Sequence, residues 1–314
     1  MTLIATLIGL SFTLFCGVAI VINCIVLHAM FKARYPCINP LYILTAFTIG
    51  TCTLRMTVIG FYYAPQIIFE RTLLGENDTD QVPFLITSFI VVMWAEAAFT
   101  QVLIALNRVF TMRDMPQKRW FSKRNCLIYI VIIIPQTAVV LWISYSLLPC
   151  CKYYFFRHLY SVWPLIIDGQ ANMIMDYVFR PLNILCYSLP VVCYVMIFAQ
   201  VYTATREQQS GSSAERRREV ARTLHFAYAF IFYLGLYISL ELQPYIPKSM
   251  PVLNVFEIYL AICDCVSMAV IQATMNKNIR RNIKWKPSQW VNRVKPSQSS
   301  QIGVTWIEPT SLKY

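Results

Sequence analysis

The chain has 314 residues, of which 57% are hydrophobic and 13% are charged, and its mean hydropathy is +0.52. In soluble domains about a quarter of the residues are charged, so this composition excludes an ordinary soluble domain. The net charge of +12 would suggest a nucleic-acid partner in a soluble protein, but here the apolar residues stand in long blocks. Such blocks are typical of helices surrounded by lipid, and we therefore expect an all-α integral membrane protein with no nucleic-acid partner.

Seven apolar runs are long enough to cross a bilayer, which requires roughly 20 helical residues. The expected spans cover residues 3–31, 41–64, 84–107, 126–148, 181–204, 220–242 and 252–275. The first run has no basic region before it and is too long for a secretory signal, so we interpret it as an uncleaved anchor. Residues 1–275 thus form a seven-transmembrane domain, and residues 276–314 form a basic tail. No internal repeat is visible, which argues against a transporter built from inverted halves.

The distribution of basic residues predicts the orientation of the chain. Of its 27 lysines and arginines, 21 lie in the flanks on one side of the spans, five lie on the other side, and Arg55 lies within a span. Cytoplasmic flanks carry the excess of such residues, so we expect the N-terminus outside the cell and the C-terminus in the cytoplasm. The sequon Asn77-Asp78-Thr79 falls in an outer connection of this topology, and Asn77 is therefore the expected glycosylation site.

Charged side chains inside the spans are candidate site residues, because a charge at membrane depth is costly unless it faces the bundle interior. Arg55 lies about 22 Å from the cytoplasmic start of its span, and Glu96 lies about 18 Å from the cytoplasmic end of the next, antiparallel span. We therefore expect an Arg55–Glu96 ion pair. This pair either lines a ligand cavity together with Trp94 or only fixes helix packing. Asp264 is expected near the same depth in the seventh span.

The outer stretch CCKYYFFRHLYSVWPLIIDGQ, which starts at Cys150, is rich in aromatic residues. These side chains either cover a ligand pocket or form an aromatic belt at the level of the lipid headgroups. Glu241 and Glu257 fall near the outer ends of the sixth and seventh spans, and we interpret them as interfacial.

Two basic segments are expected to face the cytoplasm. In REQQSGSSAERRREVARTLH, a flexible part rich in Ser and Gly leads into an Arg-rich helix start. In NKNIRRNIKWKPSQW, Ile279 and Ile283 lie four residues apart among cations, which predicts a short helix over 277–286 resting on membrane lipids. Such segments either only set the topology or also bind a partner.

Enzyme signatures are absent from the sequence. The three histidines are not spaced for a metal, no pair of cysteines has the CxxC spacing, and no nucleophile elbow or phosphate-binding loop is found. We expect no enzymatic activity, no metal and no cofactor.

Three motifs resemble those of a known receptor family. They are INCIVLHAMF around Asn23, LIALNRVF at the end of the third span, and DCVSMAVIQATMNKNIRR, which leads out of the seventh. With seven spans and an outer N-terminus, the chain resembles a G-protein-coupled receptor, and more specifically the nematode serpentine chemoreceptors of the Srx class. CKYYF after the fourth span also fits this class.

The resemblance implies a plasma-membrane chemoreceptor, with the sensory cilium as a candidate location and olfaction as a candidate role. Its ligand would be a small molecule, and its partner would be the α subunit of a heterotrimeric G protein. Arg108 would be the arginine that is held at rest and then contacts this subunit, and Asn107 replaces the acidic neighbour that often restrains it. Further basic residues would extend the coupling surface: Arg216, Arg217, Arg218 and Arg222.

The sequence also departs from the general receptor pattern. The outer end of the third span has no cysteine for the usual disulfide, and the seventh span has no Pro and Tyr after Asp264. Two other readings therefore stay open. One is a channel or transporter subunit in which Arg55, Glu96 and Asp264 line a path, and the other is a non-signalling structural protein or decayed receptor.

Overall fold

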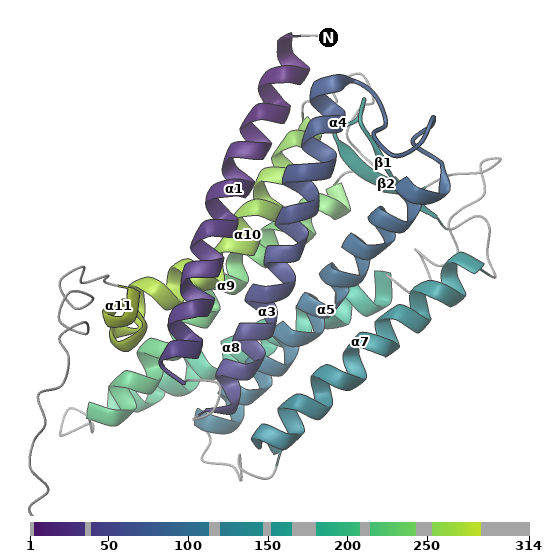
Figure 1. Ribbon diagram of the computed structural model, residues 1–314. Coiled ribbons are helices and arrows are strands. Elements are labelled where there is room, and N and C mark those ends of the chain that lie inside the picture. Colours follow the sequence, from purple (N-terminus) through teal and green to yellow (C-terminus); the bar gives the residue numbers. More distant parts are fainter. Residues whose placement is uncertain are drawn as a thin grey trace, which may run out of the picture. The chain divides into compact units, whose positions relative to one another are not determined.

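The computed structural model describes residues 3–34, 39–112, 120–146, 152–164, 180–207, 214–242 and 253–283. Within these ranges the chain is almost entirely helical (Figure 1). The helices are α1 (Leu3–Lys32), α3 (Pro40–Val58), the π-helical turn η1 (Ile59–Tyr63), α4 (Ala64–Phe69), α5 (Gln81–Met112), α7 (Lys123–Ser146), α8 (Arg180–Glu207), α9 (Ala214–Leu242), α10 (Leu253–Met275) and α11 (Lys277–Ile283). One hairpin is described, formed by β1 (Tyr153–Phe156) and β2 (Ser161–Pro164).

Five of the described helical segments are long and apolar enough to cross a membrane. They are Leu3–Lys32, Pro40–Phe69, Gln81–Thr111, Arg180–Gln200 and Leu253–Thr274. In α9 the described stretch Phe226–Leu242 is also apolar. The chain is therefore a multi-pass membrane protein, as its composition predicts.

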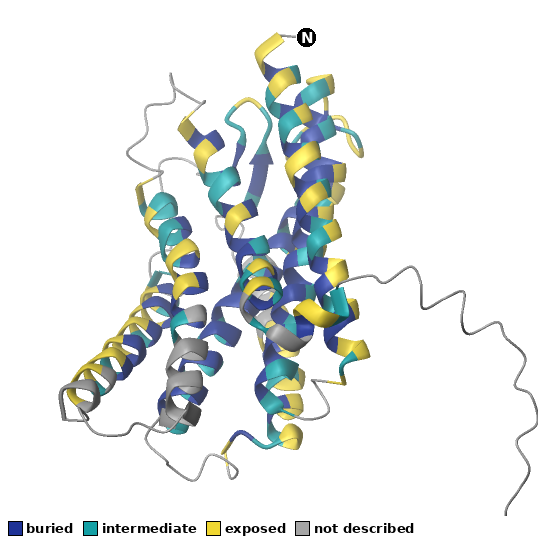
Figure 2. Cartoon of the chain, turned by 90° about the vertical axis from the view of Figure 1, so that its left-hand side faces the viewer, coloured by how far each residue is buried: buried dark blue, intermediate teal, exposed yellow. Residues whose placement is uncertain are grey.

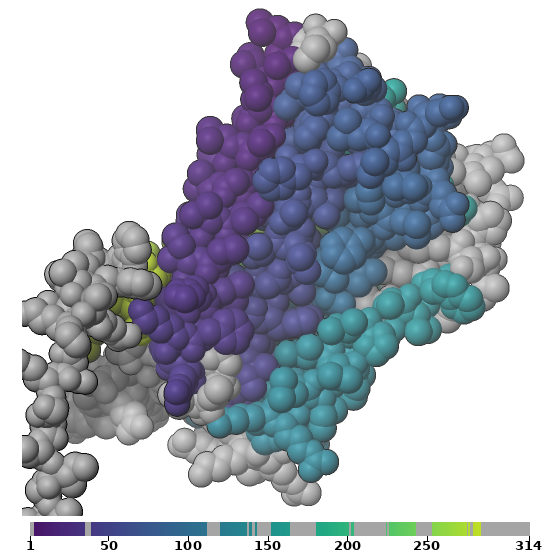
Figure 3. Space-filling model, in the orientation of Figure 1, coloured from purple at the N-terminus to yellow at the C-terminus, as the bar shows by residue number. Residues whose placement is uncertain are grey.

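The helices pack in a bundle around α3, α5 and α10. Helix α1 lies against α3 and α10, α5 contacts α3, α7 and α8, and α9 contacts α10 (Figure 1). Figure 3 shows α1, α3 and α5 side by side on one face. Side chains that face neighbouring helices are buried, whereas those on the outer faces are exposed (Figure 2). Many exposed side chains are large and apolar, among them Leu14, Val131 and Val195, each more than 60% exposed. Exposed apolar surface on this scale is what a lipid-facing surface requires.

A π-helical turn joins α3 to α4 within one continuous rod. The backbone N–H of Ala64 donates to the carbonyl of Ile59, five residues earlier, directly before Pro65, which has no N–H to donate. Gly60 lies in this turn, and a Cβ at this position would be 2.8 Å from the Cβ of Cys16 in α1. The glycine thus permits close packing between α1 and the rod.

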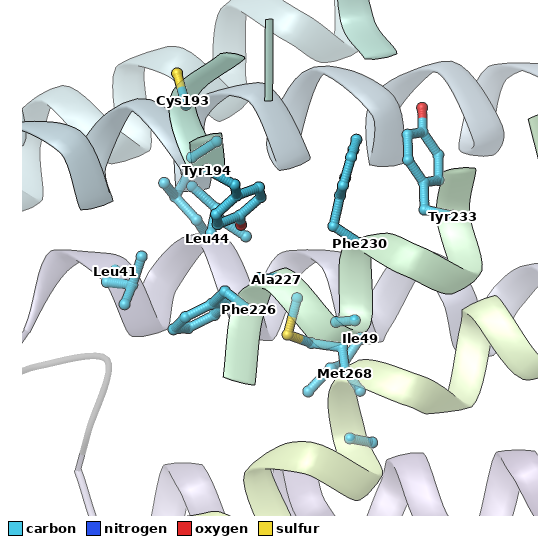
Figure 4. Close-up of a cluster of buried hydrophobic side chains, with 14 of the residues drawn as sticks. Leu41, Leu44, Ile49, Cys193, Tyr194, Phe226, Ala227, Phe230, Tyr233 and Met268 are labelled. Atoms are coloured by element: carbon cyan, nitrogen blue, oxygen red, sulfur yellow. The ribbon is translucent and has the colours of Figure 1, made fainter. Parts of the chain in front are cut away.

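Two apolar clusters fill the bundle. One joins parts of α3, α5, α8, α9 and α10, and Figure 4 shows its Leu44, Ile49, Phe230 and Met268. The other joins α1, the α3–α4 rod and α10 with the hairpin.

The short helix α11 begins after Asn276, whose Oδ1 accepts a hydrogen bond from the N–H of Ile279. Its sequence predicts a helix lying on lipid, over 277–286. The helix is present over Lys277–Ile283, but Ile279 is fully buried in the bundle core, where α11 contacts α1. Part of the apolar face of α11 therefore binds the protein itself. Residues 284–314 lie outside the described residues.

Candidate functional site

An ion pair between α3 and α10 lies in the interior of the bundle. The Nη1 atom of Arg55 is 3.6 Å from Oδ2 of Asp264, and both side chains are almost fully buried. Opposite charges at membrane depth compensate each other, so this contact holds α3 against α10.

The prediction that Arg55 pairs with Glu96 is wrong, although its estimate of depth was sound. The hydroxyl of Tyr63 donates to that of Thr87 at 3.1 Å, which identifies the side of α5 that faces the α3–α4 rod. Arg55 lies eight residues from Tyr63, and Glu96 lies nine from Thr87, so the two charges have similar depths. However, nine residues at about 100° each turn the helix by half a turn, and Glu96 therefore points away from α3.

Asn23 of α1 joins the same layer of the bundle. Its Nδ2 donates to the backbone carbonyl of Cys265 at 3.2 Å, directly beside Asp264. Asn23 and Cys265 are fully buried, whereas Cys263 is exposed on the other face of α10. The first-span asparagine thus fixes α1 to the helix that carries the acidic half of the ion pair.

A stack of three tyrosines joins α8 to α9. The ring of Tyr187 lies over Tyr233 at 4.6 Å and over Tyr237 at 3.8 Å between ring centroids. Tyr187 and Tyr233 are both deeply buried, and Tyr233 appears beside Phe230 in Figure 4. No sequence motif marks these tyrosines, because the stack joins rings from two different helices.

Helix α5 carries polar side chains that find no partner in the described part of the chain. The Nε1 of Trp94, the Oε1 of Glu96 and the Oε1 of Gln101 are buried there without a hydrogen bond. Trp94 and Gln101 are seven residues apart and share a face of the helix, whereas Glu96 lies on another.

The aromatic hairpin packs on the end of the bundle formed by η1 and the start of α5. The ring of Phe155 stacks on Tyr63 with centroids 3.9 Å apart, and the ring of Tyr154 lies 5.8 Å from that of Phe84. Phe155 and Tyr154 are each only 4% exposed. A belt at the headgroups would require outward-facing rings, so these two residues fit a cover over the helices.

Two acidic side chains that we expected to be interfacial have protein partners: Glu241 near the C-terminal end of α9 and Glu257 near the N-terminal end of α10. Oε2 of Glu257 lies 2.9 Å from the hydroxyl of Ser161 in β2, and Oε2 of Glu241 lies 3.4 Å from Nε of Arg180. Within the turn of the hairpin, burial raises the pKa of Tyr160, and a nearby carboxylate adds to this effect, so the phenol stays protonated.

Arg108 lies within α5, because the helix continues to Met112 instead of ending at the Asn107-Arg108 pair. Its guanidinium carbon is 5.0 Å from the centroid of the Phe226 ring in α9, and Arg108 is only 3% exposed. This cation–π geometry is attractive and holds the C-terminal end of α5 to α9. Asn107 is buried as well, and its carbonyl accepts a hydrogen bond from the hydroxyl of Thr111.

The remaining predicted residues are less constrained. Asn77 is exposed in the connection between α4 and α5, and exposure is a requirement for glycosylation. The four further coupling candidates belong to α9, but their side chains lie outside the described part: Arg216, Arg217, Arg218 and Arg222.

This architecture defines a helical, multi-pass membrane protein with a charge-paired interior and an arginine held at one end of a central helix. Comparison with known families identifies it further. Residues 12–271 match the family model of the serpentine type 7TM GPCR chemoreceptor Srx. Because the match covers most of the chain, the protein belongs to this family of receptors. A search of the curated proteins finds no match.

Proposed function

We propose that this protein is a plasma-membrane chemosensory receptor with seven spans, an outer N-terminus and a cytoplasmic C-terminus. It binds an extracellular chemical and activates a heterotrimeric G protein. The membership of the chain in a chemoreceptor family supports the receptor role. The surplus of basic residues on one side supports the orientation.

The observation that carries the coupling proposal is the position of Arg108. It lies near the cytoplasmic end of α5, almost fully buried, with its guanidinium over the ring of Phe226 in α9. In our proposal this is the resting arrangement. Agonist binding favours a second packing in which α9 moves, and Arg108 becomes available to the α subunit. The free energy that agonist contributes must exceed that of the contact, about 0.5–2 kcal/mol.

The outer half of the bundle is the proposed ligand side. The aromatic hairpin covers the ends of α4, α5 and α10, and Ser161 connects it to α10 through Glu257. The Arg55–Asp264 pair, the partly buried Trp94 and the buried Glu96 lie deeper, between this cover and Arg108. A ligand that shifts α10 relative to α3 would alter the ion pair directly.

The channel reading has less support, because Arg55 and Asp264 are paired with each other. Two mutually paired charges do not present a row of sites to a permeating ion.

The test is nucleotide exchange on a promiscuous α subunit in cells that express the chain and receive pooled chemicals. Arg108→Ala should lower the agonist-stimulated rate at least tenfold while surface expression remains normal. Arg124→Ala is the matched control, because Arg124 is an exposed cation at the start of α7 without a comparable aromatic contact in the described residues. An unchanged rate in Arg108→Ala, or a chemical-gated current that needs no G protein, would contradict the proposal.

A further inference from the structure

Glu96 is a buried carboxylate that has no partner among the described residues. It is 1% exposed, and its Oε1 atom accepts no hydrogen bond from the described part of the chain. No described basic side chain forms a salt bridge with it. A carboxylate in this state costs several kcal/mol of folding free energy, and proteins tolerate such a group chiefly where it has a function.

The charges of the interior show what would complement it. Among the described residues, four charged side chains are buried: Arg55, Glu96, Arg108 and Asp264. Arg55 is paired with Asp264, and Arg108 lies 12 residues further along α5 than Glu96, or about 18 Å at 1.5 Å per residue. The middle of the bundle therefore holds one carboxyl group, that of Glu96, with no opposite charge among the described residues. An anionic ligand would be repelled by its ionised form, whereas a cation would stabilise that form.

The position of Glu96 on its helix connects it to the coupling end. Thr100 and Asn107 follow it at four and eleven residues, which places all three within about 40° of the helix surface. All three are buried, and the hydroxyl of Thr100 donates to the carbonyl of Glu96 at 2.7 Å. A ligand on Glu96 would therefore act on the polar face of α5 that ends at the neighbour of Arg108.

We propose that Glu96 is the anionic anchor for a small organic cation, a protonated amine or a quaternary ammonium compound. The carboxylate accepts hydrogen bonds from an amine or forms an ion pair with a quaternary centre. This inference deepens the proposed function and rests on it for its signalling consequence, but the binding step itself requires no G protein.

The first arm of the test needs no ligand. In the purified, detergent-solubilised chain, Glu96→Gln should raise Tm by about 2 °C or more, because a neutral amide of the same shape replaces an uncompensated charge. Asp264→Asn is the matched control and should lower Tm, since it leaves Arg55 buried without its partner. A decrease of Tm in Glu96→Gln would show that the carboxylate has a structural partner and would overturn the proposal.

The second arm uses a panel of primary to quaternary ammonium compounds, each matched with an alcohol and a carboxylate of the same carbon skeleton. At least one cation should raise the Tm of the wild-type protein, whereas the alcohol and the carboxylate matched with that cation should not. The Glu96→Gln variant should bind that cation with at least tenfold lower affinity. Failure of every cation, equal binding to Glu96→Gln, or carboxylate binding that Arg55→Gln abolishes would each overturn the proposal. If a cation binds through Glu96 without stimulating nucleotide exchange, the anchor is supported and the proposed coupling fails. If only uncharged chemicals stimulate exchange, the proposed coupling is supported and the cation anchor fails.

Discussion

Replacing Asp264 by Asn removes the negative half of the buried ion pair and leaves the Arg55 guanidinium without compensation. At the observed 3.6 Å, with an effective dielectric constant of about 20, the Coulomb attraction is about 4–5 kcal/mol. Measured costs of breaking one side of a buried pair are about 3–5 kcal/mol. Both figures predict a destabilisation of about 4 kcal/mol, or roughly 8 °C in Tm for a chain of this size.

A double-mutant cycle distinguishes the pair from two independent effects. Arg55→Gln combined with Asp264→Asn should be more stable than Asp264→Asn alone, because no lone charge is left, and the coupling energy should be about 2 kcal/mol or more. The matched cycle with Glu96→Gln should give a coupling near zero, since Glu96 points away from α3. Thermal denaturation of the purified variants measures both cycles. Additive effects at Arg55 and Asp264, or strong coupling between Arg55 and Glu96, would refute the reasoning.

Three further outcomes are expected. Gly60→Ala should cost about 1–3 kcal/mol of stability, because the new Cβ would lie 2.8 Å from an α1 side chain. Gly17 has open space around it, so Gly17→Ala should not destabilise the chain. Thermal denaturation compares the two variants. Phe226→Leu should raise agonist-independent nucleotide exchange by several fold, because it removes the aromatic face that holds Arg108, and Phe226→Tyr should keep the basal rate low. Asn77→Gln should remove one glycan's mass from the surface protein on a gel; an unchanged mobility would show that the exposed sequon is not used.

Helices and their approximate ends follow from the sequence, because an apolar block of about 20 residues has few alternatives in lipid. The depth of a charge also follows, since the helical rise is constant. Arg55, Glu96 and Asp264 were therefore all expected near the same level. Whether Arg55 pairs with Glu96 or with Asp264 depends on the rotation of each helix about its axis. The Tyr63–Thr87 contact defines this rotation for α5, whereas a count of residues along one span does not.

Other features depend on contacts between distant segments. The π-helical turn has a local signal in Gly60 and Pro65, yet its role appears only when Cys16 of α1 is seen against the glycine. Ile279 has the spacing of a lipid-facing residue, but a pocket in the bundle core is a better apolar environment for it. The partner of Arg108 could not be inferred either, because Phe226 is one of 19 phenylalanines and carries no motif.

The most direct test of the account is nucleotide exchange on a purified α subunit by the chain reconstituted in lipid, with and without pooled chemicals. We expect at least one pool of chemicals to accelerate nucleotide exchange by the wild-type protein. The Arg108→Ala variant, at an equal amount of folded protein, should lose this acceleration. Equal stimulation by both proteins would contradict the role of Arg108. A pool that instead opens an ion conductance in the same lipid without the α subunit would contradict the receptor function itself.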